Sequence, residues 1–436
     1  MFQRSRPLTA WSGARLGGKI PRVARAGRIF RRSVLGIVGL CAFAGPLRLS
    51  AQGSTDQLGP ALRQLGPQIA RARDSLGSSL SICVLSDGRV LVNDRDRRRV
   101  LLLDPHLGGP RTIMDSTGQA RRRYSNTAGG LIRYRGDTTL FIDPDALAFV
   151  AILPSGAIGK TTAIPPDPSL LAALLGTGTA AFDPSGRLVY RDAPDAQFLM
   201  GKVVRHPRPA TGATTRDTTA ILRLDLTTHR TDTLGTFSTQ RRINGSRSID
   251  SAGHHFGIAV MNPILLSDDF ALLEDGSVAL IRAQDYHVDW ITPAGVRESS
   301  PRIPHEWHRL TDSAKAAIVD SMKRYNAAHA RHVTQYDQRG QFAMDVVDDV
   351  VDPAQLADYP APFLPGARAD AEGDVWVRQP SGSAAGSVYD IVDRRGALTD
   401  RVELPGGTTL VGFGPGVVYV SAREAWGASL ATYRIR

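Results

Sequence analysis

Two pairs of histidines have the residue type and spacing of a possible metal site. His305 and His308 bracket Glu306, and His329 and His332 stand three residues apart further along the chain. Histidine nitrogens are common zinc ligands, so the two pairs could hold zinc if the fold brought them together. The His-Glu-x-x-His spacing of catalytic zinc helices is missing. The sequence favours the alternative, in which all four are surface side chains around a polar helix.

Three aspartates recur at the end of the second strand of a repeated unit, namely Asp94, Asp143 and Asp192. If carboxylates from three units met at one point, they could perform acid–base chemistry or bind a cation. Equivalent positions in different repeats of a ring point apart, however. Aspartates in turns usually accept hydrogen bonds from nearby backbone amides. We therefore expect structural turn roles for these three residues.

Other chemical signatures are missing from the sequence. There is no glycine-rich phosphate loop, no Ser-His-Asp motif and no cysteine pair, so no catalytic residue is assigned and no cofactor-binding motif is predicted. A divalent metal is the one cofactor that the residues leave open. The arginine clusters at 121–123 and 241–247 lack interleaved aromatic residues, so we expect no nucleic-acid partner. Cys83 lies in an apolar run, which predicts a buried structural thiol.

The basic charge of the chain is concentrated at its start. The 436 residues include 53 Lys and Arg against 42 Asp and Glu, a net charge of +11. Ten of the basic residues lie within residues 1–51, which contain no acidic residue. Without them, 43 basic and 42 acidic residues remain. The excess charge therefore does not indicate an acidic partner for the rest of the chain.

Residues 1–51 are predicted to form a signal peptide. An apolar run over 34–47 follows a basic segment and precedes small residues at 50–51, which is the layout of a bacterial secretory signal. The run is shorter than the ~20 residues that a membrane span needs, so no stable span is expected in the mature chain. We expect a periplasmic or extracellular protein.

Two details concern the route of export. Arg31 and Arg32 before the apolar run resemble a twin-arginine signal, and an ordinary secretory signal is the alternative. Cys41 is not expected to carry a lipid, because Leu40 before it is not a small residue.

A pattern of apolar strand, Asp/Gly turn, second strand, polar loop and third strand recurs along the chain. Glycine in such turns supplies the positive φ that joins antiparallel strands, and β-branched residues favour the strands. Four short strands at a period of about 45–50 residues are typical of a β-propeller. The fold is therefore predicted to be all-β, with six blades. The six copies span residues 81–104, 131–156, 181–225, 270–295, 370–396 and 410–435.

Ring closure requires a strand from elsewhere in the chain, because the sixth copy lacks its outermost strand. The natural donor lies within 67–72, where a strand would remove an exposed sheet edge. A short helix over 60–73 is the alternative. Residues 52–75 are thus predicted to be a leader and closing strand, and 76–436 to be the propeller.

Two stretches break the repeat, at 193–262 and at 300–350, and both are predicted to be insertions. Within the second, Thr311 is expected to cap a helix that runs to about His332, with apolar residues at three-to-four spacing. This helix near 311–332 would lie on one face of the ring.

The repeats resemble NHL-type and related six-bladed propellers of exported bacterial proteins. The resemblance covers roughly 76–436 and rests on Asp-Gly-Arg-Val-Leu-Val-Asn-Asp at 87–94 and Glu-Gly-Asp-Val-Trp-Val at 372–377. Such motifs specify architecture well and function poorly.

Two functions are compatible with the sequence. The first is a non-enzymatic, exported propeller that binds a protein, peptide or glycan through a ring face or loop rim. The alternative is a metal-dependent hydrolase or lyase that resembles the sugar-lactonase type, whose members hold a divalent metal with Glu, Asn and Asp from separate blades. No residue of this chain matches those ligands position by position. The sequence does not predict the oligomeric state.

Overall fold

The computed structural model describes residues 59–436 with gaps, all within the second of two compact units, Met1–Gly45 and Pro46–Arg436. The predicted signal peptide, Cys41 included, lies outside the described residues. The side chains of 194–217, 240–259 and 330–348 are also outside the description. The remaining gaps are 74, 120–121, 128, 176–179, 265, 381–385 and 426.

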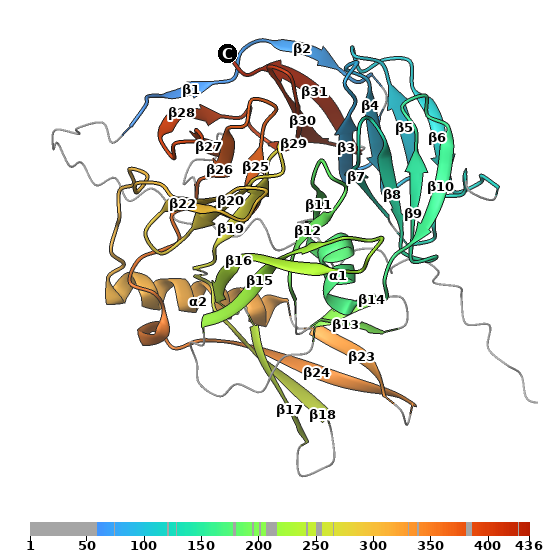
Figure 1. Cartoon of the computed structure of the whole chain (residues 1–436). Helices are drawn as coiled ribbons and strands as arrows, with labels where there is room; N and C mark the ends of the chain where they lie inside the picture. The colour runs from blue at the N-terminus through green and yellow to red at the C-terminus, as the bar shows by residue number, and fades with distance from the viewer. Residues whose placement is uncertain are drawn as a thin grey trace, which may run out of the picture. The chain divides into compact units, whose positions relative to one another are not determined.

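Six four-stranded antiparallel sheets form a ring, so the predicted six-bladed β-propeller is confirmed (Figure 1). The inner strands of neighbouring blades approach one another between blades 6 and 1, 1 and 2, 2 and 3, and 4 and 5. Blade 1 contains β3 (Leu80–Val84), β4 (Val90–Asp94), β5 (Arg99–Leu103) and β6 (Arg111–Asp115). Blade 2 contains β7 (Gly130–Arg133), β8 (Thr139–Asp143), β9 (Ala148–Ile152) and β10 (Ile158–Ala163).

The other four blades follow the same antiparallel order, from the inner to the outer strand. Blade 3 contains β11 (Ala181–Phe182), β12 (Leu188–Arg191), β15 (Arg216–Leu224) and β16 (Thr231–Gln240). Blade 4 contains β19 (Asp269–Leu272), β20 (Val278–Arg282), β21 (His287–Ile291) and β22 (Arg297–Ser299). Blade 5 contains β25 (Arg368–Ala369), β26 (Val375–Arg378), β27 (Val388–Val392) and β28 (Leu398–Glu403). Blade 6 contains β29 (Thr408–Gly414), β30 (Val417–Glu424), β31 (Gly427–Arg434) and β2 (Gln68–Arg71).

The ring is closed by a strand from the early part of the chain, as predicted. Strand β2 pairs antiparallel with β31, and the helix considered as the alternative for this stretch is wrong. A further short strand, β1 (Leu62–Gln64), was not predicted; it adds to blade 5 in parallel with β28. There Arg63 donates to the Asp400 carboxylate from Nε and Nη2, at 2.8 and 2.5 Å from Oδ2.

The hydrophobic core lies between the blades, in one cluster for each of the six interfaces. Strand β4 shows how the sequence builds it, because successive side chains of a strand point to opposite faces. Leu91 packs toward blade 2, whereas Val90 and Val92 pack toward blade 6. All three are fully buried. An apolar run in a middle strand therefore contributes side chains to the cores on both sides of its blade.

One face of the ring carries the turns after the first and third strands, and these turns are linked from blade to blade. In blade 4 the first turn depends on Gly276, whose φ of +85° is in the left-handed region that favours glycine. Ser86 of blade 1 donates its backbone N–H to Asp137 of blade 2. The backbone N–H of Gly416 in blade 6 donates to Glu372 of blade 5. We call this surface the turn face.

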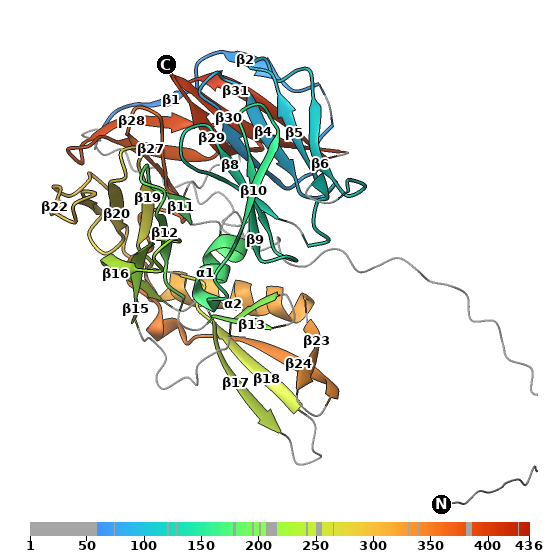
Figure 2. The same cartoon turned by 45° about the vertical axis from the view of Figure 1, so that its right-hand side comes forward.

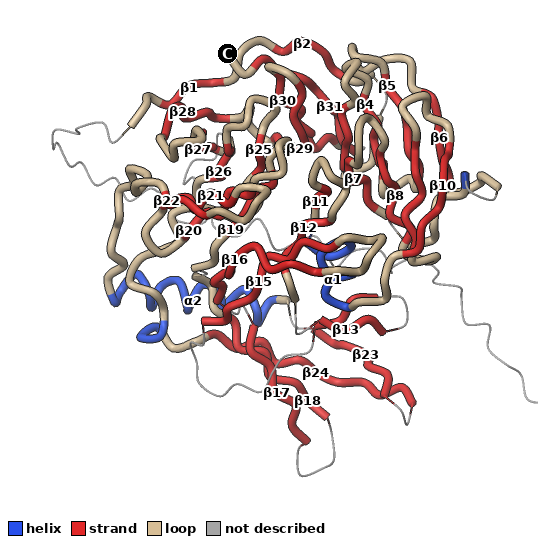
Figure 3. The backbone as a smooth tube through the Cα atoms, in the orientation of Figure 1, coloured by secondary structure: helices blue, strands red, loops and turns tan. Residues whose placement is uncertain are grey.

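The opposite face carries the connections between blades and the turns after the second strands, and it holds all the additional elements (Figures 1 and 2). We call it the insertion face. Figure 3 shows how few helices accompany the strands. The additional elements are α1 (Pro168–Ala172), η2 (Ala173–Thr177), β13 (Ala196–Leu199), β14 (Lys202–Arg205), β17 (Ile243–Ile249), β18 (His255–Met261), α2 (Asp312–Ala328), β23 (Arg331–Asp337), β24 (Gly340–Val350) and η3 (Pro353–Gln355).

Two of the insertions join to form one sheet, in the order β17-β18-β24-β23. Strands β18 and β24 pair in parallel at its centre, although they come from connections on either side of blade 4. The stretch 193–262 also contains β15 and β16, which complete blade 3. It is therefore partly blade and partly insertion.

The predicted helical insertion is present as α2. Thr311 caps it, because its side chain accepts a hydrogen bond from the backbone N–H of Ala314. The helix ends at Ala328 rather than near His332, because the chain enters β23 at Arg331 and pairs with β24. Val319 of α2 packs into a small core with residues around β24 and η3. No helix in the described part of the chain is long and apolar enough to cross a membrane.

Candidate functional site

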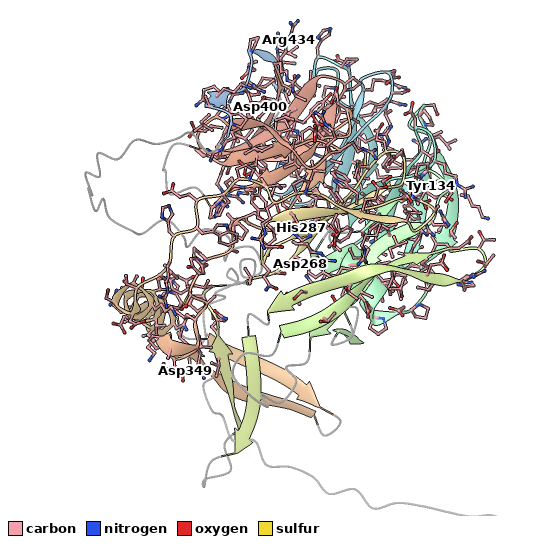
Figure 4. All side chains as sticks on the ribbon, turned by 60° about the vertical axis from the view of Figure 1, so that its left-hand side comes forward. Tyr134, Asp268, His287, Asp349, Asp400 and Arg434 are labelled. Carbon is pink, nitrogen blue, oxygen red and sulfur yellow. The ribbon has the colours of Figure 1, made fainter. Side chains whose placement is uncertain are left out.

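A pocket of about 910 Å³ lies on the insertion face beside blade 4. Its walls come from five separate parts of the chain. They are the end of β16, the segment before β19, the turn between β20 and β21, the segment after β22 and the segment after η3. Figure 4 places two of its lining residues, Asp268 and His287, on the side of the ring toward α2. We call it the blade 4 pocket.

The turn over 282–287 forms the floor of this pocket. Arg282 and His287 are cross-strand partners at the ends of β20 and β21. Tyr286 has a φ of +48°, which is uncommon for a residue with a side chain. Its ring is fully buried, and its hydroxyl donates to Asp390 Oδ2 of blade 5 at 3.0 Å. The strained residue thus fastens the pocket floor to the next blade.

Arg282 joins two buried carboxylates. Its Nη1 lies 2.8 Å from Asp268 Oδ2, and its Nε lies 2.7 Å from Asp289 Oδ2. Its Nη1 also donates to the carbonyl oxygen of Thr236 in blade 3 at 2.8 Å. Charge-assisted hydrogen bonds of this kind hold the side chain in one orientation. The arginine therefore links blades 3 and 4 at the pocket.

His287 stands between two carboxylates. Its Nδ1 is 2.7 Å from Asp285 Oδ1, and its Nε2 is 3.3 Å from Asp289 Oδ1. Burial alone would raise the pKa of Asp289, but hydrogen bonds from Ser299 and Arg282 outweigh it and lower that pKa. His287 is thus held by a hydrogen bond at Nδ1, and its Nε2 lies close to a second carboxylate.

Aromatic rings line the outer wall of the blade 4 pocket. Trp307 and Tyr359 are exposed by 37% and 42%, and their rings meet at 90° with centroids 6.1 Å apart. Behind them, His305 lies between Trp307 and the buried Tyr286, with centroids 5.0 and 5.7 Å away. Burial lowers the pKa of His305, and the nearby His308 acts in the same direction. The pocket therefore has a continuous aromatic side.

The histidines considered for a metal site occupy different surroundings. His305 packs in the aromatic wall, and His308 is exposed, with its Nε2 3.4 Å from Glu306. His329 caps the far end of α2, where its ring stacks on Tyr325. The side chain of His332 lies outside the described residues. The helix α2, with 17 residues and a length of roughly 25 Å, lies between the two pairs in the chain.

The described part of the chain contains no group of three or more His, Cys, Asp or Glu side chains placed to hold a metal ion.

The three recurring aspartates make local contacts. Asp94 accepts from the backbone N–H of Gly77 at 3.1 Å. Asp143 accepts from the backbone N–H groups of Asp145 and Ala146 within its own turn. Asp192 accepts from the Ser169 hydroxyl at 2.6 Å. Each carboxylate thus holds its own turn or the adjoining connection.

Cys83 lies in the core between blades 1 and 2. Burial raises the pKa of its thiol to about 12. A thiol with so high a pKa carries almost no thiolate at neutral pH, and it is therefore a poor nucleophile or metal ligand.

The sequence did not single out the charged residues of the blade 4 pocket. Arg282 is the last residue of β20, a position that arginine also holds in blades 3 and 5 and that aspartate holds in blades 1 and 2. Its residue type therefore gave no signal of a pocket. Trp307 lies between two histidines in a connection, and a single tryptophan there does not predict a site. Tyr359 carried no signal, since only the fold brings it to Trp307.

Comparisons with known proteins add little beyond the fold. The sequence matches no known protein family and no curated protein. A calcium-binding regucalcin from Agrobacterium tumefaciens is 13% identical over 86% of this chain and 97% of its own, with a TM-score of 0.36. Virginiamycin B lyase from Staphylococcus aureus is 12% identical, covers 85% and 99%, and gives 0.34. A gluconolactonase from Xanthomonas campestris is 11% identical, covers 85% and 99%, and gives 0.36. At such values the likeness supports no site or activity for this chain.

Proposed function

We propose that this protein is an exported, non-enzymatic β-propeller that binds a ligand on its insertion face. The observation that supports this most directly is the blade 4 pocket, with its charged floor and exposed aromatic wall. A concave site with a few well-placed polar groups is the usual form of a binding site. The NHL-like character of the repeats is part of this proposal.

The side chains of the pocket support binding better than catalysis. Arg282 is committed to two carboxylates, and His287 has a hydrogen bond at Nδ1 and a carboxylate oxygen 3.3 Å from Nε2. A general base needs a free nitrogen or oxygen within reach of the substrate. A preorganised polar surface, in contrast, suits recognition because little ordering is needed when the ligand binds.

The first test locates ligand binding on the purified protein. A detergent extract of a bacterial envelope is added, and amide hydrogen exchange is followed. We expect slower exchange at 282–287 and 302–309, with no change at 371–373 on the turn face. Protection confined to the turn face would overturn the proposal.

The second test addresses the metal-dependent hydrolase. The metal content of the purified protein is measured, and a panel of sugar lactones is screened with and without a chelator. We expect substoichiometric metal and no lactone hydrolysis above the uncatalysed rate. Stoichiometric metal together with chelator-sensitive hydrolysis would establish the enzyme instead.

Export is proposed from the sequence of residues 1–51. Fused to a periplasmic reporter, this segment should direct the reporter across the inner membrane. Replacement of Arg31 and Arg32 by lysine should block export only if the twin-arginine route is used. A reporter that stays in the cytoplasm with the intact segment would contradict export by either route.

A further inference from the structure

We propose that the blade 4 pocket binds a neutral carbohydrate chain. This inference rests on the proposed function and narrows its ligand to one chemical class. It follows from the aromatic wall, the balance of charge, the blocked strand edge and the size of the pocket.

The aromatic wall provides the apolar contact that sugar rings need. Among the described residues, the exposed large hydrophobic side chains include two aromatics, Trp307 and Tyr359, and both line this pocket. An exposed ring face supplies flat apolar area at little conformational cost. The C–H face of a sugar ring can pack on such a surface while its hydroxyl groups remain free for hydrogen bonds.

Each carboxylate that lines the pocket already has a cationic partner. Asp268 pairs with Arg282. Asp285 lies 2.7 Å from His287 and 3.7 Å from Arg302.

The third lining carboxylate, that of Asp358, also has cationic partners. Asp358 is 2.6 Å from Lys315 Nζ, and its second oxygen is 3.2 Å from Arg309. With its acids matched, the pocket offers little net attraction to a strongly charged ligand. It still presents both hydrogen-bond donors and acceptors, which suits a ligand that carries many hydroxyl groups.

A peptide that adds as a strand finds its edge blocked. At the outer edge of β16, the backbone N–H of Ser238 donates to Asp268 Oδ2 at 2.9 Å. The carbonyl oxygen of Ser238 accepts from the backbone N–H of Asp268 at 2.8 Å. Strand addition needs these backbone groups to be free. The edge that borders the pocket is therefore unavailable to an extended peptide.

The size of the pocket fits a short carbohydrate segment. Its volume of about 910 Å³ is at the upper end of the ~300–1,000 Å³ range of ligand sites. Polar groups of the floor, such as Gln284, and the aromatic wall both line this space. A sugar unit can therefore pack on the wall while a neighbouring unit reaches the floor.

The test uses an array of neutral and acidic oligosaccharides, followed by calorimetry with each oligosaccharide that is bound. Hexalysine and hexaglutamate serve as charged peptide probes. The variants are Trp307→Ala, Trp307→Phe and a matched control, Val296→Ala. Val296 is 56% exposed in blade 4 and does not line the pocket. Circular dichroism confirms that each variant is folded.

We expect binding of neutral oligosaccharides that Trp307→Ala weakens at least about tenfold, because a central aromatic contact is lost. Trp307→Phe should largely restore binding, and Val296→Ala should leave it unchanged. Glycan binding that survives Trp307→Ala would overturn the assignment to this pocket.

Other outcomes separate this inference from the proposed function. An array without any bound glycan, combined with peptide binding that Trp307→Ala abolishes, would overturn the carbohydrate assignment and leave the ligand-binding proposal intact. An empty array together with no protection by the envelope extract would overturn both.

Discussion

Blades 1 and 4 have the same turn after their second strand, with inverted charge. The turn in blade 1 runs from Asp94 to Arg99, and that in blade 4 runs from Arg282 to His287; each end pair is in cross-strand register. The residue before the third strand is left-handed in both turns, with φ of +49° at 98 and +48° at 286. In blade 1, one carboxylate faces two arginines. In blade 4, one arginine faces two carboxylates.

The two turns, whose charges are inverted, also differ in their exposure to the pocket. The carboxylate of Asp94 is fully buried and closes against the connection before β3 through Gly77. Arg282 instead lines the blade 4 pocket and reaches across to blade 3. The same repeat position thus closes a turn in blade 1 and lines the blade 4 pocket in blade 4.

The largest expected effect is that of Arg282→Met. Loss of the shared cation removes the arginine partner of two buried carboxylates, which keep only their backbone, serine and histidine contacts. Breaking a buried ion pair costs about 3–5 kcal/mol. Urea unfolding should show this loss in the free energy of unfolding at neutral pH. The matched control is Arg230→Met, because the Arg230 side chain is 82% exposed. A loss of unfolding free energy below about 1 kcal/mol for Arg282→Met would show that these ion pairs contribute no more than exposed surface ion pairs do.

A smaller effect is expected for Asp94→Asn in blade 1. The substitution removes the charge that faces Arg97 and Arg99, but it keeps an oxygen for the N–H of Gly77. Hydrogen bonds to charged groups suggest a loss of about 2–3 kcal/mol in unfolding free energy. The same urea titration measures it, and binding at the blade 4 pocket should be unchanged. Impaired binding would mean that the two turns are not independent.

Asp289→Asn tests the open network through its pH dependence. Folding lowers the pKa of Asp289 from its ordinary value of 3.8. The ionised carboxylate therefore stabilises the native state above pH 3.8, and this contribution is lost as the pH falls through the folded-state pKa. We expect a loss of about 1.5 kcal/mol at neutral pH.

The gap between Asp289→Asn and the parent protein should then narrow below pH 3.8. Unfolding measured by urea between neutral pH and pH 3 follows this gap. A gap that stays constant over the whole range would contradict the lowered pKa.

The smallest effect is expected for Arg133→Ala. Arg133 of blade 2 pairs with Glu274 of blade 4 at 2.6 Å, but both side chains are more than half exposed. Exposed pairs contribute about 0–1 kcal/mol, so the melting temperature should hardly move. A large shift in thermal unfolding would show that the turn face depends on this link between non-adjacent blades.

The sequence predicted the parts of the fold that repeat. Strand, turn and strand recur with local signals, such as the glycine at 276, so six blades could be counted. The closing strand was predictable because an unpaired edge demands a partner. Strand β1 was not, because three residues carry no recognisable alternation and their pairing depends on the distant contact of Arg63 with Asp400.

The candidate site could not be predicted from the sequence, for a different reason. The blade 4 pocket draws its residues from stretches between 238 and 359 that only the ring and its insertions bring together. The two histidine pairs could have formed a metal site only if the fold had brought them together. In the structure, one pair precedes α2 and the other follows it.

The pairing of β2 with β31 has a consequence for the rate of folding. The side chains of Gln68 and Tyr433 meet across 365 positions of sequence. Closing a loop of that length costs about 5 kcal/mol in chain entropy, a cost that rises only with the logarithm of loop length. Contacts so distant in sequence slow folding much more than they limit stability. We therefore expect the pairing of β2 with β31 to form late in folding.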